Sequence, residues 1–99
     1  IIYVSGFNVY PSEIENIISR HPAVEECIVI GIKDEKSGER PFAFVVPKHG
    51  IGVTQEELKE FCGGYLTRYK IPKQILFKSS LPKNVLGKVQ RSQVHKLME

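Results

Sequence analysis

The sequence contains no tryptophan, one methionine and only two cysteines in 99 residues. It has no apolar run close to the roughly 20 residues of a membrane-spanning helix, which argues against a transmembrane segment. Cys27 and Cys62 stand far apart in apolar surroundings, so we interpret them as buried thiols in a reducing compartment. The three histidines are scattered singly without metal-ligand spacing, which argues against a zinc site.

Strong charge is also missing. The formal net charge of +3 is too small to indicate nucleic-acid binding by itself. Such binding would need aromatic residues interleaved with basic ones, whereas we interpret Phe42 and Phe44 as core residues on one strand face. An apolar fraction of 41% in 99 residues predicts one globular domain with one compact core. The start at Ile1, inside a strand-like run and without methionine or a visible signal peptide, leads us to expect a fragment of a longer protein.

Apolar periodicity and turn residues predict a small α+β domain. The expected elements are, in chain order, short strands at 1–4 and 7–10, a helix beginning at 11, strands at 24–33 and 42–46, a helix from 54 to about 69, a strand at 74–78 and a helix from about 89 to 97. This order predicts a small, mostly antiparallel three-stranded sheet with packed helices, plus an N-terminal β-hairpin.

Local signals support most of these elements. Pro11 suits the first position of a helix, where its missing N–H is not needed. Thr54 and Glu57 match a capping box at the start of the second helix. The Gly63-Gly64 pair inside that helix is unexpected, at about 1 kcal/mol per glycine, so we expect either a bend or a closely packed neighbour there. The last helix is expected to turn three apolar residues inward: Val94, Leu97 and Met98.

The stretch LPKNVLGK at 81–88 places the cation of Lys88 on a loop shaped by Pro82 and Gly87. Loops often carry functional charges, so this lysine is a candidate for contact with an anion. A solvated surface lysine is the alternative interpretation. The stretch is not a P-loop, because Pro82 stands where that motif has its first glycine and Val89 replaces its hydroxyl residue.

Two further features have both a structural and a functional interpretation. Gly6 serves either a plain hairpin turn or a close approach of a ligand to the backbone. Arg68, Lys70 and Lys73 either complement the C-terminal end of a helix or form a phosphate-binding surface. The charged connector 34–40 is interpreted as a solvated loop. Because no nucleophile–base pair or carboxylate pair has catalytic spacing, we expect the domain to contribute a cation to an active site built elsewhere.

Four motifs together resemble a known family. GFNVYPSEIE at 6–15 resembles the signature that opens the C-terminal domain of adenylate-forming acyl-CoA synthetases. HPAV at 21–24, YKIPK at 69–73 and LPKNVLGK at 81–88 resemble the later landmarks of that domain, in the same order. The first motif is most similar to bacterial long-chain fatty acid–CoA ligases. The resemblance implies that residues 1–99 are the C-terminal lid domain of an AMP-binding acyl-CoA synthetase, without its large N-terminal domain.

The resemblance also implies a reaction and its participants. The family activates a carboxylic acid with ATP to an acyl-adenylate, releases pyrophosphate and transfers the acyl group to the thiol of coenzyme A. The N-terminal domain of the same polypeptide would bind ATP, Mg²⁺ and the acid, here a fatty acid, and nucleic acid would not be a partner. The protein would be cytoplasmic, and in full-length form a candidate for peripheral attachment at the inner face of the membrane.

Roles for individual residues follow from the same resemblance. Lys88 would be the adenylation lysine and would reach the carboxylate and the α-phosphate region. After the lid rotates, the hairpin with Gly6 and Phe7 would line the pantetheine channel of coenzyme A. The three basic residues introduced above, Arg68, Lys70 and Lys73, would be candidates for contacts with coenzyme A phosphates. We expect the isolated chain to be inactive.

The sequence departs from the family pattern near its start. Many relatives carry a second lysine near Ile2 or Tyr3, and the usual hinge residue would fall just before Ile1. Other interpretations therefore stay open. The chain resembles, less closely, the equivalent part of an aryl-acid or short-chain-acid ligase or of a peptide-synthetase adenylation domain. A binding module for RNA or an acyl carrier, or a purely structural interaction domain, are alternatives from other classes.

Overall fold

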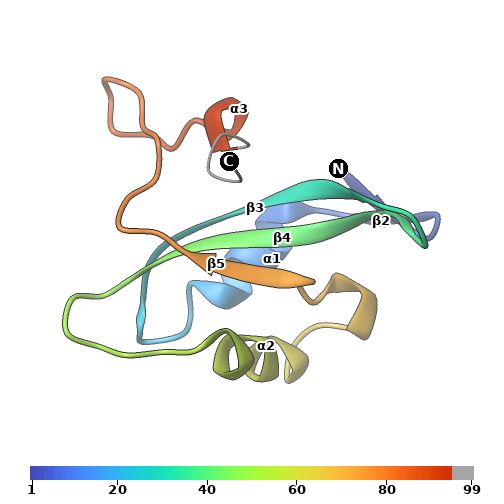
Figure 1. Cartoon of the computed structure of the whole chain (residues 1–99), viewed down its shortest axis with the longest axis horizontal. Coiled ribbons are helices and arrows are strands. Elements are labelled where there is room, and N and C mark those ends of the chain that lie inside the picture. The colour runs from blue at the N-terminus through green and yellow to red at the C-terminus, as the bar shows by residue number, and fades with distance from the viewer. Residues whose placement is uncertain (95–99) are drawn as a thin grey trace.

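The computed structural model describes residues 1–94, and a single sheet with helices on both faces organises them (Figure 1). Its five strands are β1 (Ile2–Val4), β2 (Phe7–Val9), β3 (Val24–Asp34), β4 (Gly38–Pro47) and β5 (Gln74–Phe77). Strand β4 is central, with β3 along one edge and with β1 and β5 sharing the other. The predicted α+β class and the mostly antiparallel sheet are confirmed, but β5 runs parallel to β4.

The sequence predicts an N-terminal hairpin in addition to the sheet. In the structure, the two strands of this hairpin are part of the sheet. Ser5 and Gly6 both have positive φ, 50° and 84°, as a two-residue type I′ turn requires. Val4 pairs with Gly38 at the beginning of β4, and the Ser5 N–H donates to the Ser37 carbonyl at 2.8 Å. The tips of the β1–β2 and β3–β4 hairpins are therefore joined.

Helices α1 (Pro11–Ile18) and α2 (Gln55–Gly63) cover one face of the sheet. Pro11 lies at the start of α1 as predicted, and the Thr54 hydroxyl accepts from the Glu57 N–H at 3.1 Å to cap α2. The apolar stripe of α1 and the inner residues of α2 pack on the same strand side chains. This cluster includes Ile14, Ile17, Ile18, Val29, Ala43, Val45, Leu58, Cys62 and Ile75.

The second helix is shorter than predicted, because the Gly63-Gly64 pair ends it. Gly64 is the C-terminal cap, and a separate 3₁₀ turn, η1 (Arg68–Lys70), carries the basic residues. An added Cβ at Gly63 would meet only the Ile71 Cδ1 at 3.8 Å, an ordinary contact. The pair is therefore explained neither by a bend nor by a close neighbour. Two adjacent poor helix formers simply make continuation unfavourable.

The opposite face of the sheet is covered by the chain that follows β5. Phe44 is fully buried there, which confirms its assignment to the core, and Leu81 and Val94 close over it. Helix α3 (Arg91–Val94) begins later than predicted, because Val89 is still bridged to Lys83. Figure 1 shows α3 and α2 on opposite sides of the sheet. The inward positions predicted at residues 97 and 98 lie outside the described residues.

The predicted solvated connector is largely strand. Strand β3 continues to Asp34 and β4 begins at Gly38, so only the three residues between them form the turn. The Asp34 carboxylate holds this turn by accepting from the Ser37 hydroxyl at 2.7 Å and from the Ser37 N–H at 3.0 Å. The charges of the connector are thereby fixed on a rigid hairpin. Among the described residues, no helix has the length and apolarity to cross a membrane.

Candidate functional site

The residues predicted to be functional lie at two ends of the sheet (Figure 1). Lys88 belongs to the long loop between β5 and α3, at one end. The turn between β1 and β2, with Gly6, lies at the other end beside the β3–β4 turn and η1. The structure therefore brings Gly6, Phe7 and Arg68 into one region and separates them from Lys88.

The Lys88 loop is closed by hydrogen bonds that Asn84 organises. The Asn84 Oδ1 accepts from the N–H groups of Leu86 at 2.9 Å and Lys88 at 3.0 Å, and the Asn84 N–H donates to the Lys88 carbonyl at 2.8 Å. Gly87 completes the turn with a φ of 84°. The backbone of Lys88 is thus held in place while its side chain is exposed. Our sequence analysis missed Asn84, although an Asn three residues before a Gly is a recognisable turn signal.

Two ion pairs attach this loop to the rest of the domain. The Lys83 Nζ lies 2.6 Å from the Glu26 Oε1 on β3. On the far side of the loop, the Arg91 Nη2 lies 3.1 Å from the Glu15 Oε2 of α1, and the Arg91 Nη1 donates to the Val29 carbonyl. Lys88 itself makes no ion pair with any residue in the range 1–94. Within this range, no carboxylate neutralises its charge, as a contact with an external anion requires.

At the opposite end, the conformation of the turn accounts for Gly6. Its positive φ disfavours other residues, whereas a Cβ built on Gly6 would meet no atom within 4 Å. The neighbouring Phe7 is 55% exposed and stacks on Tyr69 of η1, with ring centroids 4.8 Å apart. The hairpin is thereby fixed against η1, and open space remains above the glycine.

The predicted basic strip is only partly available. The Lys70 Nζ lies 2.9 Å from Glu13, and this hydrogen-bonded pair raises the pKa of Lys70. The Lys73 Nζ lies 2.7 Å from Asp34. Lys73, followed by Ser37, holds the pKa of Asp34 well below its usual range. Two of the three basic residues are therefore partly neutralised by carboxylates.

Arg68 instead lines a hollow of about 310 Å³ between the two hairpin tips and η1. Ser5, Ser37 and Tyr69 also line this hollow, and so does Arg40, which our sequence analysis placed among the charges of a solvated connector. No local sequence signal marks Arg40, because its position depends on the pairing of β3 with β4. Arg40 also lines a second hollow, of about 530 Å³, together with Lys73, so two of the described hollows join a predicted site residue to one that was missed.

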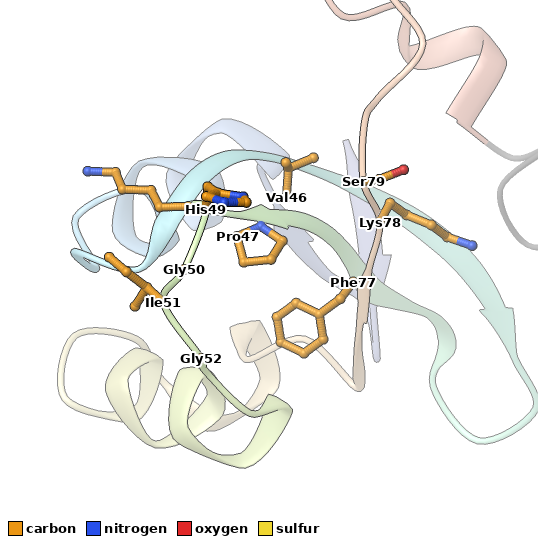
Figure 2. A pocket seen from close by; sticks show the side chains of 10 residues that line it. Val46, Pro47, His49, Gly50, Ile51, Gly52, Phe77, Lys78 and Ser79 are labelled. Carbon is orange, nitrogen blue, oxygen red and sulfur yellow. The ribbon is translucent and has the colours of Figure 1, made fainter.

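A larger hollow, of about 700 Å³, lies elsewhere and contains none of the predicted site residues (Figure 2). It lies between the end of β4, the following segment and the end of β5. Figure 2 shows the Phe77 ring in the space between Pro47 and Gly52. This open surface has an apolar floor but offers no nucleophile with an activating partner, so we do not assign chemistry to it.

The cysteines and the acidic residues supply no further chemistry. Burial raises the pKa of the Cys62 thiol to about 11 and also raises the pKa of Cys27. Cys62 is buried, as predicted, and Cys27 is half-buried. Both thiols are protonated at neutral pH and are poor nucleophiles. Within the part of the chain that the structure describes, no group of three or more His, Cys, Asp or Glu residues could hold a metal ion.

Comparison with protein families assigns this arrangement to a class. Residues 13–88 match the family model described as AMP-binding enzyme C-terminal domain. The chain therefore belongs to this family of AMP-binding enzyme C-terminal domains. The family that the four sequence motifs predict is confirmed.

The relatives that the chain matches are named for different carboxylic acids. The 2-succinylbenzoate–CoA ligase of Geobacillus sp. (strain WCH70) is 50% identical over 98 residues, which are 99% of this chain and 20% of that protein. The long-chain-fatty-acid–CoA ligase of Yersinia pestis is 48% identical over 94 residues, which are 95% of this chain and 16% of that protein. The chain thus spans a fifth or less of the relatives that it matches.

Solved structures agree with the fold. The Mycobacterium tuberculosis fatty acyl CoA synthetase matches with a TM-score of 0.90 and 41% identity, covering 97% of this chain and 19% of that chain. ATP-bound MatB from Rhodopseudomonas palustris matches with a TM-score of 0.92 and 35% identity, covering 98% of this chain and 19% of that chain. The predicted lid-domain fold is confirmed.

Proposed function

We propose that this domain is the lid of an acid–thiol ligase that converts a carboxylic acid and ATP to an acyl-adenylate and then transfers the acyl group to coenzyme A. The observation that carries the proposal is the Lys88 loop. Asn84 holds its backbone, its ammonium makes no ion pair with residues 1–94, and its motif lies inside a family match. The family resemblance gives the role, and the geometry supports it.

In the adenylation step, the Lys88 ammonium would lie beside the acid carboxylate and the α-phosphate. Negative charge builds up on the oxygens there as the carboxylate attacks and pyrophosphate leaves. A fixed cation in a site closed off from water stabilises that charge more strongly than one exposed to solvent. The bonds from Asn84 to the loop backbone reduce the reorganisation that this placement needs. ATP and Mg²⁺ would be held mainly by the N-terminal domain.

In the thioester step, the opposite end of the domain would face the same site. The open space above Gly6 would admit the pantetheine arm beside Phe7, and Arg68, Lys70 and Lys73 would lie near the coenzyme A phosphates. Because the Lys88 loop and the Gly6 turn lie at two ends of the sheet, one orientation cannot present both to a single pocket (Figure 1). This separation supports a lid that reorients between the two half-reactions.

For the acid itself we propose a long-chain fatty acid. The Yersinia pestis relative and the Mycobacterium tuberculosis structure, both named for fatty acids, support this choice. An aromatic acid is the second candidate, because the Geobacillus relative named for 2-succinylbenzoate is similarly close. With a fatty acid as substrate, we propose a cytoplasmic protein that attaches to the inner face of the membrane, where such acids partition.

The test uses the full-length parent protein with ATP, Mg²⁺ and coenzyme A. We expect palmitate to give stoichiometric AMP and palmitoyl-CoA, followed by mass spectrometry, and 2-succinylbenzoate to give little of either. The reverse preference would replace the fatty acid by an aromatic acid. Absence of AMP formation with every acid of a broad panel would contradict the ligase assignment.

A second test uses the 99-residue chain alone. We expect it to fold, as judged by cooperative thermal unfolding in circular dichroism, and to form no acyl-adenylate. The described residues provide a cation but no nucleotide-binding loop or metal site. Robust adenylate formation by this chain would show that the active site is not built mainly elsewhere.

A further inference from the structure

The Lys88 loop extends away from the sheet, and its tip has little contact with the rest of the domain (Figure 1). Val85 at the tip is fully exposed, and Leu86 is 80% exposed. The two arms of the loop are bridged to each other at Lys83 and Val89, so the loop holds its own shape. The direction in which it points must therefore be set by contacts at its base.

Arg91 lies at this base, where it opens α3. Its Nη1 donates to the carbonyl of Val29 on β3, and its Nη2 lies 3.1 Å from the Glu15 Oε2 of α1. The same carboxylate oxygen accepts from the Val29 N–H at 2.8 Å. The three residues thus close a ring of contacts that joins α1, β3 and the end of the Lys88 loop.

The ring fixes the arginine in direction as well as in place. Strand β3 is an edge strand of the sheet that residues 1–94 form, so the outward N–H and carbonyl of Val29 need partners other than a strand. Glu15 and Arg91 supply them. A planar guanidinium holds two acceptors in fixed directions, whereas the ammonium of Lys83, paired with Glu26, is a rotatable point charge.

Resting on the proposed function, we infer that Glu15 and Arg91 are positioning residues for the adenylation step. They set the direction of the loop on the sheet and thereby the place of the Lys88 ammonium. Asn84 fixes the shape of the loop from within, and the ring at the base fixes its orientation. A rotation at the base displaces the ammonium, and a misplacement of about 1 Å can cost about 10²-fold in rate.

Helix α1 offers a matched control at the opposite end of the domain. Glu13, two residues before Glu15, pairs with Lys70 of η1 at 2.9 Å. The helix therefore carries one carboxylate for the base of the Lys88 loop and one for η1. Loss of either carboxylate removes one charge and one ion pair from the same helix, but only the loss at Glu15 should disturb the loop.

The experiment measures adenylation by the full-length parent as acid-dependent pyrophosphate exchange. We expect Glu15→Gln and Arg91→Gln each to lower kcat about tenfold or more, with the KM for ATP unchanged. Thioester formation from a supplied acyl-adenylate should keep its rate. Glu15→Gln retains the side-chain volume and an acceptor for the Val29 N–H, so it keeps the test valid if Arg91→Gln misfolds. Equal losses in both half-reactions would overturn the inference.

Three further variants test whether the pair acts as a directional unit. The double variant of Glu15→Gln and Arg91→Gln should lose no more than either single variant, and losses that multiply would overturn the unit. Arg91→Lys keeps the charge without the fork of donors and should recover only part of kcat, so full recovery would overturn a directional role. Glu13→Gln should leave adenylation unchanged. A loss there equal to that of Glu15→Gln would reduce the effect to a destabilised helix.

An orientation measurement separates this inference from the ligase assignment. Nitroxide labels are placed at Val85→Cys and at Glu60→Cys, an exposed position of α2 across the sheet, in a full-length parent whose other reactive cysteines are replaced. Their distance distribution, measured by double electron–electron resonance, should be narrow and should broaden on Glu15→Gln. Broadening would support the inference even if the parent has no ligase activity. A distribution that stays narrow would overturn the inference and leave the proposed function intact.

Discussion

The two ends of this domain are built in different ways. The Lys88 loop is a contiguous stretch that folds back on itself through Asn84 and Gly87, and two ion pairs attach it to the core. The hollow at the other end is formed by two hairpin tips and η1, which are far apart in the sequence. A cation can therefore be presented by a short motif, whereas a binding hollow requires several segments to be placed by the sheet.

The largest expected effect concerns Lys88 itself. In the full-length parent, Lys88→Ala should reduce adenylation, measured by acid-dependent pyrophosphate exchange, about 10²–10³-fold, because charge at the α-phosphate loses a fixed cation. Thioester formation from a supplied acyl-adenylate should fall far less, since we propose that the other end of the lid serves that step. Lys48→Ala is the matched control and should leave both rates unchanged. Equal losses in the two half-reactions of Lys88→Ala would remove the functional distinction between the two ends.

Asn84 tests whether the loop positions the lysine. Asn84→Ala removes the acceptor of two backbone N–H groups, at a cost of about 1 kcal/mol for each bond. We expect adenylation kcat to fall about tenfold with little change in the KM for ATP, because the cation is bound less accurately in the transition state. Asn84→Asp retains the acceptor oxygen and should restore most of the rate. A uniform rise in the KM for ATP would instead indicate a defect in lid closure.

Substitutions of Gly6 distinguish two reasons for a glycine at this position: the conformation of the turn and the proposed passage of the pantetheine arm. Gly6→Ala should destabilise the chain by about 1 kcal/mol, measured by urea unfolding, because alanine disfavours positive φ. Gly6→Asn should cost less, since asparagine tolerates that conformation. If the turn alone requires glycine, the Asn variant will form thioesters at the normal rate. If the pantetheine arm passes over the glycine, the Asn variant will be stable yet slow in thioester formation, which is the outcome we expect.

The smallest effect concerns the ion pair beside the hollow. The hydrogen bonds of Asp34 with Lys73 and Ser37 lower its pKa below the ordinary value of 3.8. The contribution to stability is therefore fully present above that value and is lost as the pH falls through it toward the lowered pKa. Asp34→Asn should lower the urea midpoint slightly at neutral pH, and the difference from the unsubstituted chain should vanish in strong acid. A difference that persists in strong acid would show that the charge is not its source.

Several features of the fold could be predicted because their causes are local. Pro11 and Thr54 mark helix starts through groups that need no distant partner, and the Ser5-Gly6 turn follows from two residues that adopt positive φ. The end of α2 was missed, because helical spacing of apolar residues continued past Gly63 and outweighed the weak propensity of two glycines in our interpretation. Beyond Gly64, Leu66 is still buried and Tyr69 of η1 still packs against the core, whereas Tyr65 is exposed.

The sequence by itself determined the family, the order of strands and helices, and the loop of Lys88. Each of these depends on short motifs or on interactions between residues that are close in the sequence. Only the tertiary structure decided that β5 runs parallel to β4, that Lys70 and Lys73 are paired with carboxylates, and that Arg40 lies beside Arg68. These facts depend on strand register and on contacts between residues about 30 or more positions apart. Such contacts form only when burial of the shared core brings the segments together, and no local pattern encodes them.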